Sequence, residues 1–299
     1  MISTRSEAAT LKTKIHKGLI GTPTDAYLEQ LKAAGFEGME STDRAASPDK
    51  AEAVRKNAEK LGLRIHSVLY GWANFNKPES LAGDLASVET ALRACQAYGA
   101  TTLLLVPCRV GGNGMRIPDA WQFDIRFDEK SGHVKQVVAG DNTPYAAYIE
   151  AHNQAIDTSR EAVKRLIPTA EKTGILIALE NVWNNLWVKP DLAQNFIASF
   201  DSPWVRSYFD IGNHVKYAPP EVWVRTLGKL IVKCHVKDFK LAPDGHGGKF
   251  CDIREGSINW PAVRQALDEI GYNSWLTIEG GSLSMAEHSR RLDLILAGE

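Results

Sequence analysis

The segment AEKTGILIALEN (170–181) decides the fold. It joins an amphipathic stretch through Gly174 to a short apolar run that ends in Glu180 and Asn181. The same order of features recurs in LKAAGFEGMEST (31–42), AEKLGLRIHSVLYG (58–71), CQAYGATTLLLVP (95–107) and LDEIGYNSWLTIEG (267–280). A Gly after the last helical turn is typical of a helix C-cap, and a short β-rich apolar run is typical of a buried strand. The recurrence predicts alternating helices and strands.

Reading the rest of the chain in the same way gives eight strands and eight helices. The strands are expected near 15–20, 36–41, 64–70, 101–106, 175–180, 205–211, 231–237 and 275–279. The helices are expected near 24–34, 48–61, 80–99, 145–173, 190–200, 219–229, 259–269 and 284–297. This alternation predicts an α/β protein, a single (β/α)8 TIM barrel. An open doubly wound sheet is disfavoured because no G-x-G-x-x-G turn follows the first strand. We expect one domain over 1–299, with an N-terminal extension over 1–14.

One connection, a loop insertion over 107–145, is much longer than the others. Within it, WQFDIRFDEKSGHVKQVVAG (121–140) alternates apolar and polar residues on both sides of a turn at Gly132. That alternation predicts a β-hairpin. Long structured loops after barrel strands often bind substrate or act as lids, although a decorative hairpin or an oligomer contact fits the sequence equally well.

Composition narrows the class of protein. The 299 residues are 44% hydrophobic and 24% charged, which is typical of a globular chain with a substantial core. Lys plus Arg (35) and Asp plus Glu (36) nearly cancel, so the whole chain has no charge excess for nucleic acid or an anionic membrane. No signal peptide or spanning segment is apparent, and the four cysteines have no C-x-x-C spacing. We therefore expect a soluble cytoplasmic protein, for which a homo-dimer or tetramer is compatible with the sequence.

Ligand-capable side chains stand at successive strand ends. Because all strands of a parallel barrel end on one face, these side chains should converge in space. In chain order they are Glu40, His66, Cys108, Glu180 with Asn181, Asp210 with His214, His235 with Lys237 and Asp238, and Glu279. The last four strands supply Glu180, Asp210, His235 and Glu279. Three carboxylates and one imidazole suit one divalent metal, Mn²⁺ first, with Mg²⁺, Co²⁺ or Zn²⁺ as alternatives.

Five segments together resemble the xylose-isomerase-like barrels, a family of sugar and sugar-phosphate isomerases and epimerases. They are ALENVWNN (178–185), YFDIGNH (208–214), KCHVKDF (233–239), REGSINW (254–260) and WLTIEGG (275–281). The resemblance implies that Glu180, Asp210, His235 and Glu279 hold the metal, that Glu180 and Glu279 move the proton, and that His66 and His214 lie near substrate oxygens. Leu186 departs from the keto-sugar 3-epimerases, which carry another Glu at this position. Substrate contacts in this loop are therefore expected to differ.

The expected chemistry is proton transfer on a ketose through a metal-stabilised cis-enediolate. Return of the proton to the same carbon from the opposite face gives epimerisation, and return to the neighbouring carbon gives aldose-ketose isomerisation. Lys237 and Arg254 are expected to bind substrate oxygens or a phosphate, and the Trp183 ring to pack on the sugar. Each of these three residues has a plain structural role as its alternative.

Other functions remain open at this point. An inosose-type dehydratase or a keto-sugar lyase would begin with the same proton removal. An endonuclease-four-type DNA-repair nuclease shares the barrel but needs three zinc ions and a His after the fourth strand, where this chain has Val106, Pro107 and Cys108. A barrel that binds a sugar without turnover is the non-enzyme alternative, which the complete ligand set disfavours.

Overall fold

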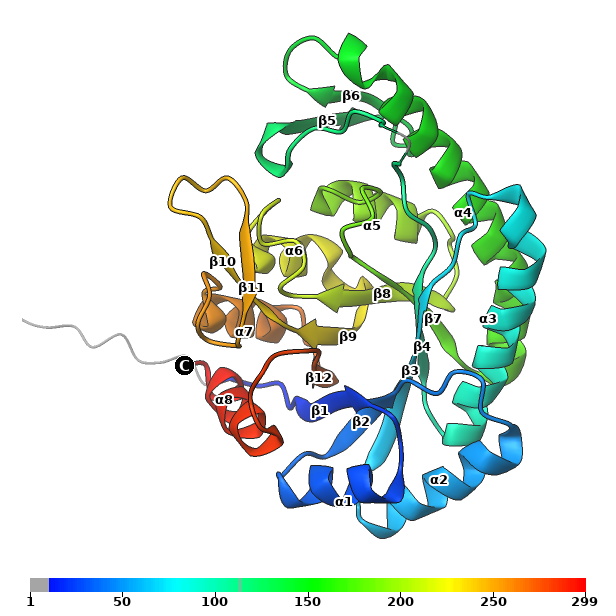
Figure 1. Ribbon diagram of the computed structural model, residues 1–299, viewed down its shortest axis with the longest axis vertical. Coiled ribbons are helices and arrows are strands. Elements are labelled where there is room, and N and C mark those ends of the chain that lie inside the picture. The colour runs from blue at the N-terminus through cyan, green and yellow to red at the C-terminus, as the bar shows by residue number, and fades with distance from the viewer. Residues whose placement is uncertain (1–10, 113) are drawn as a thin grey trace, which may run out of the picture.

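The computed structural model describes residues 11–112 and 114–299, so most of the predicted N-terminal extension lies outside the described residues. Eight parallel strands close into a barrel in the order β1-β12-β9-β8-β7-β4-β3-β2, and the helices surround it (Figure 1). The structure confirms the predicted (β/α)8 barrel.

Most of the observed helices and strands begin and end within a few residues of the expected bounds. The barrel strands are β1 (His16–Gly21), β2 (Gly38–Ser41), β3 (Arg64–Trp72), β4 (Thr102–Val106), β7 (Leu176–Glu180), β8 (Val205–Asp210), β9 (Ile231–Val236) and β12 (Trp275–Ile278). The α-helices are α1 (Asp25–Ala33), α2 (Pro48–Lys60), α3 (Pro78–Tyr98), α4 (Ala146–Thr173), α5 (Pro190–Ala198), α6 (Pro220–Leu227), α7 (Trp260–Glu269) and α8 (Met285–Ala297). Short 3₁₀ turns are η1 (Ala120–Gln122), η2 (Thr143–Tyr145) and η3 (Gly228–Leu230).

Local sequence explains where the helices begin and end. The Ser47 and Ser284 side chains accept hydrogen bonds from Lys50 N and Glu287 N, which satisfies free amides at the starts of α2 and α8. Gly99 and Gly174 end α3 and α4 with φ of 70° and 71°, a conformation that favours glycine. The recurring Gly of the sequence therefore marks the turn from helix to strand.

Alternation along β4 separates two apolar layers. Leu103 and Leu105 belong to the large cluster that includes the helices, whereas Leu104 and Val106 belong to a small cluster with Tyr208 inside the barrel. The interior also holds buried polar side chains. The strands are thus packed on both faces, and charged side chains at their carboxyl ends are attached to a rigid backbone.

Two antiparallel hairpins extend the barrel. Strands β5 (Phe123–Phe127) and β6 (Val134–Val138) pair within the 107–145 segment. Strands β10 (Asp238–Leu241) and β11 (Gly248–Cys251), which follow β9, were not expected. The ring of Trp121 in η1 stacks on His246 between β10 and β11, with centroids 4.4 Å apart. Within the described ranges no helix has the length and apolar character to cross a bilayer.

Candidate metal centre and active site

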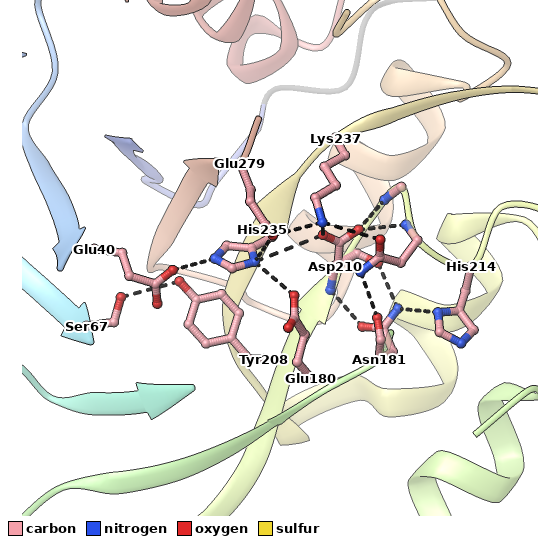
Figure 2. Close-up of polar contacts among 12 residues, drawn as sticks. Glu40, Ser67, Glu180, Asn181, Tyr208, Asp210, His214, His235, Lys237 and Glu279 are labelled. Carbon is pink, nitrogen blue, oxygen red and sulfur yellow. Dashed lines mark hydrogen bonds and ion pairs between the residues drawn. The ribbon is translucent and has the colours of Figure 1, made fainter. Parts of the chain in front are cut away.

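Four ligand-capable residues meet at the carboxyl ends of β7, β8, β9 and β12, which are consecutive around the barrel. Glu180, Asp210, His235 and Glu279 each offer one ligand atom, and these atoms all lie within 4.8 Å of one another. The first three residues are buried, and the Glu279 side chain is 27% exposed. Figure 2 shows the four side chains turned toward a common point. The structure therefore brings the predicted ligand set together.

His235 lies at the centre of this cluster. Its Nδ1 is 3.0 Å from Glu180 Oε1 and 2.7 Å from Glu279 Oε2, while its Nε2 is 2.5 Å from Glu40 Oε2. With Nε2 donating to Glu40, Nδ1 faces the other carboxylates; it donates to Glu180 while protonated and can offer its lone pair to a metal once that proton is lost. A carboxylate behind a histidine in this way fixes the tautomer and the ring orientation of a metal ligand.

The two glutamates occupy contrasting environments. Burial is the main cause that raises the pKa of Glu180. Burial acts in the same direction on Glu279, but His235 and then Lys237 outweigh it and lower its pKa. Pairs of carboxyl groups whose pKa values are pushed apart suit separate acid and base roles.

Lys237 completes the charge pattern. Its Nζ is 3.2 Å from Asp210 Oδ2 and 2.9 Å from Glu279 Oε2. Neither of these buried oxygens accepts a hydrogen bond of normal geometry. Burial by itself lowers the pKa of Lys237, but Asp210 and Glu279 raise it, so the side chain is a cation. Carboxylate oxygens left without hydrogen bonds beside an imidazole nitrogen fit a divalent metal with oxygen and nitrogen ligands.

A tight turn after β8 aims Asp210. Gly212 N and Asn213 N donate to Oδ1 over 2.9 and 2.6 Å, which leaves Oδ2 toward the cluster. The Asn181 amide ties this strand end to β7, since it accepts from Asp210 N at 2.7 Å and donates to Asp210 O at 2.8 Å. Gly212 is required by space, because a Cβ there would lie 2.7 Å from Lys237 Cβ.

A cavity of about 200 Å³ opens beside the cluster. Its lining includes Lys237 and Glu279 together with Phe250 and Cys251 of β11. Trp183 stacks on Phe250 with ring centroids 5.0 Å apart, and its indole N–H donates to Asn213 O. Two of the predicted substrate-binding residues, Lys237 and Trp183, therefore lie at or next to this cavity.

The other three predicted substrate-binding residues lie elsewhere. His66 is the third residue of β3, which continues to Trp72, so it lies near the amino end of the barrel instead of at the carboxyl end. There it stacks on Trp275 at 4.3 Å and pairs with Thr277 Oγ1 at 3.1 Å. Its expected contact with substrate is corrected by this placement, because His66 is the third residue of the strand both in the expected range, 64–70, and in β3, and so cannot lie at the carboxyl end.

His214 is buried on the far side of Asn181 from the cluster, as Figure 2 shows. Its Nδ1 is 3.0 Å from Asn181 Nδ2, and its ring packs edge-on against Trp223 at 4.9 Å. Burial is the main cause that lowers its pKa to about 3, so the ring is neutral. The structure does not bring His214 to the cavity; Asn213 from the same turn is the side chain that approaches Lys237, at 3.4 Å.

Arg254 lines a surface groove with Arg290 and Arg291 of α8. Its backbone N–H donates to Asp238 Oδ2, and its φ of 71° is in the left-handed region. It therefore does not line the cavity beside Lys237.

The family model described as "Xylose isomerase-like TIM barrel" matches residues 28–293. The chain belongs to this family. Solved structures of similar fold share few residues with it. A D-tagatose 3-epimerase-like protein is 18% identical with a TM-score of 0.71, covering 95% of this chain and 97% of that chain. A 3-keto-D-glucoside 4-epimerase from E. coli is 16% identical with a TM-score of 0.69, covering 95% and 100%.

Two further matches are a solved structure and a relative of unknown function. A xylose isomerase domain protein from Planctomyces limnophilus is 16% identical with a TM-score of 0.67, covering 96% of this chain and 95% of that chain. An uncharacterised protein of Methanocaldococcus jannaschii is 27% identical over 146 residues, 47% of this chain. The aligned part spans 48% of that relative.

Sequence reasoning missed Asn213 and Phe250 near the site. Asn213 lies in the YFDIGNH segment, next to His214, which was the predicted substrate-binding residue there. Phe250 belongs to the β10–β11 hairpin, whose signal was present as apolar and polar alternation in FKL (239–241) and GKFC (248–251) around the turn-rich PDGHGG (243–248). Glu40, whose role was open in the sequence, proves to be the hydrogen-bond partner of His235.

Proposed function

We propose that this protein is a divalent-metal-dependent isomerase that epimerises or isomerises a ketose or a ketose phosphate. The observation that carries the proposal is the meeting of Glu180, Asp210, His235 and Glu279 within 4.8 Å of one another. Three carboxylates packed this closely repel one another strongly in a buried site unless a cation joins them. Lys237 reaches only Asp210 and Glu279, whereas His235 lies within 4.0 Å of all three, so a divalent ion would take the place of the His235 proton that now joins them.

A divalent ion held by these four residues would draw charge from the ketone and hydroxyl oxygens of the substrate while the adjacent carbon loses its proton. Mn²⁺ is the first candidate, and Mg²⁺, Co²⁺ and Zn²⁺ share the ligand preference. Glu40 keeps His235 in the orientation that ligation needs. Ligation also requires the neutral ring, so it displaces a proton.

Glu180 and Glu279 are proposed as the proton-transfer pair. They follow β7 and β12, and β8 and β9 lie between these strands in the barrel. The two carboxylates therefore approach the space between them from different sides. One removes the proton from a carbon next to the ketone, and the other returns a proton to that carbon or to its neighbour.

The cavity beside Lys237 suits a polyhydroxylated substrate. The ammonium of Lys237 can donate to a substrate oxygen, and the stacked rings of Trp183 and Phe250 offer a flat apolar surface of the kind that packs on sugar faces. A sugar as substrate is supported by two proteins of similar fold, the D-tagatose 3-epimerase-like protein and the 3-keto-D-glucoside 4-epimerase. The His66, His214 and Arg254 contacts expected at first are not part of this proposal.

We also propose a cytoplasmic location. The four cysteines form no disulfide, which supports a reducing compartment such as the cytoplasm. A homo-dimer or tetramer stays a prediction. The endonuclease alternative loses support because Cys108, after β4, faces Ser159 of α4 at 3.4 Å and not the metal cluster.

Solvent deuterium exchange into a panel of ketoses and ketose phosphates tests the proposal. Exchange at the carbon next to the ketone should slow at least about 100-fold in Glu180→Gln and in Glu279→Gln. Glu171→Gln, an exposed residue of α4, is the matched control. Unimpaired exchange in both site variants would remove the two glutamates as acid and base. A product lighter by one water would identify a dehydratase, a cleaved product a lyase, and about three zinc ions per chain a nuclease.

A further inference from the structure

A second cavity, of about 490 Å³, lies at the amino ends of the strands, opposite the metal cluster. His16 begins β1, Arg64 begins β3 and Trp275 begins β12, and all three line it. None of the four proposed metal ligands does. Its volume falls in the range of about 300–1,000 Å³ that is typical of small-molecule sites. The cavity is therefore separate from the proposed active site.

Lys233 supplies a buried positive charge to this cavity. It is only 6% exposed and lies two residues before His235 on β9, so both side chains are on the inward side of the strand at successive levels. Its Nζ is 3.3 Å from Ser274 Oγ. Among the described residues no carboxylate lies within ion-pair distance of it. Glu40 acts on Lys233 only from beyond ion-pair distance, so the buried ammonium group has no carboxylate of these residues in contact, and a bound anion would reduce the cost of burying it.

The rest of the lining adds donors and few free acceptors. Arg64 makes no ion pair within the described part of the chain, and the buried Nε of Arg55 has no hydrogen-bond partner there. Of the two carboxylates in the lining, Glu37 already accepts from His16 and from Lys17 N. Glu59 is 3.8 Å from Arg55 Nε. The lining thus holds three cationic side chains, Arg55, Arg64 and Lys233, against two carboxylates, and it includes the Trp275 ring.

We propose that this cavity binds a small phosphate-bearing anion, with Lys233 and Arg64 as its charged partners. A phosphate accepts several hydrogen bonds at once, and a guanidinium can donate two of them in parallel. The stacked rings of His66 and Trp275, 4.3 Å apart, form the wall beside which the carbon skeleton of the ligand lies. This site does not depend on the proposed sugar chemistry, since it shares no residue with the metal cluster.

The experiment compares Lys233, which lines this cavity, with Lys237, which follows the same strand and lines the cavity beside the metal cluster. Thermal midpoints are measured with inorganic phosphate against sodium chloride at equal ionic strength, for the wild type, Lys233→Met and Lys237→Met. Phosphate should raise the midpoint saturably in the wild type and in Lys237→Met, because a ligand that binds only the folded state stabilises it. Lys233→Met should lose that response.

A second variant keeps the proposal falsifiable if Lys233→Met does not fold. Arg64→Gln changes an exposed side chain at the rim and should weaken apparent phosphate binding at least about tenfold. The proposal is overturned if phosphate has no saturable effect on the wild type. It is also overturned if the effect is undiminished in both Lys233→Met and Arg64→Gln, or if it is lost in Lys237→Met alone. A stronger response to citrate than to phosphate would overturn the assignment of the anion.

Discussion

Glu40 of β2 and His235 of β9 meet inside the barrel, with Oε2 and Nε2 2.5 Å apart, although 195 residues separate them in the chain. Both side chains are fully buried. Burial alone would lower the pKa of His235, but the carboxylates of Glu40 and Glu279 and the hydrogen bond to Glu180 outweigh it and raise that pKa well above its usual range. The pair therefore orients the ring and raises its affinity for protons.

Replacing Glu40 by Gln should weaken binding of the metal. Gln keeps the shape and a hydrogen-bond acceptor, but it removes the charge that makes the imidazole a stronger ligand. Loss of such a supporting carboxylate typically costs about 10- to 100-fold in metal affinity. Mn²⁺ titration calorimetry on protein stripped with a chelator measures this, with Glu171→Gln as the control. Equal Mn²⁺ affinity in the wild type and Glu40→Gln would show that Glu40 has no such role.

Gly212→Ala should damage the turn that holds Asp210 and Lys237. The added methyl would lie 2.7 Å from Lys237 Cβ and 2.9 Å from its carbonyl oxygen. Overpacking of this kind costs about 1–3 kcal/mol, and the shifted turn should also reduce Mn²⁺ binding. Gly83→Ala in α3 is the matched control, since nothing lies within 4 Å of its Cβ position. Urea unfolding should show a loss of stability for Gly212→Ala and none for Gly83→Ala; the same stability in both would contradict the steric account.

Stability should fall as the solution is acidified, partly because of His214. Burial is the main cause that lowers its pKa in the folded protein to about 3, from an unfolded value near 6.5. Between these values the unfolded chain binds the proton and the folded protein does not. The contribution of His214 is thus complete above about pH 6.5 and is lost toward pH 3, at up to about 1.4 kcal/mol per pH unit.

Urea unfolding at pH 7 and pH 5 measures this slope. His214→Gln removes the titrating group, so its stability should depend less on pH than that of the wild type. His246→Gln, whose side chain is half exposed, serves as the control and should keep the wild-type slope. A slope in His214→Gln as steep as that of the wild type would assign the acid sensitivity to other groups.

The sequence predicted the barrel because its signals are local. Gly174 ends a helix, and the apolar run after it is short and β-rich, so both signals can be read within a few residues. The proposed ligands Glu180 and Asp210 are the last residues of their strands, so the end of an apolar run was sufficient to place them on one face. The β10–β11 hairpin was missed because its alternation is short and one strand is mostly exposed.

What the sequence by itself determined is the alternation of elements, the closed barrel and the four residues that share its carboxyl face. Only the tertiary structure decided which of the remaining polar side chains reach that face. It placed His66 at the opposite end and Asn181 between His214 and the cluster, and it joined Glu40 to His235. The physical reason is that alternation gives a side chain one of two directions, whereas a contact across the barrel depends on strand length and on the relative register of strands that are not neighbours.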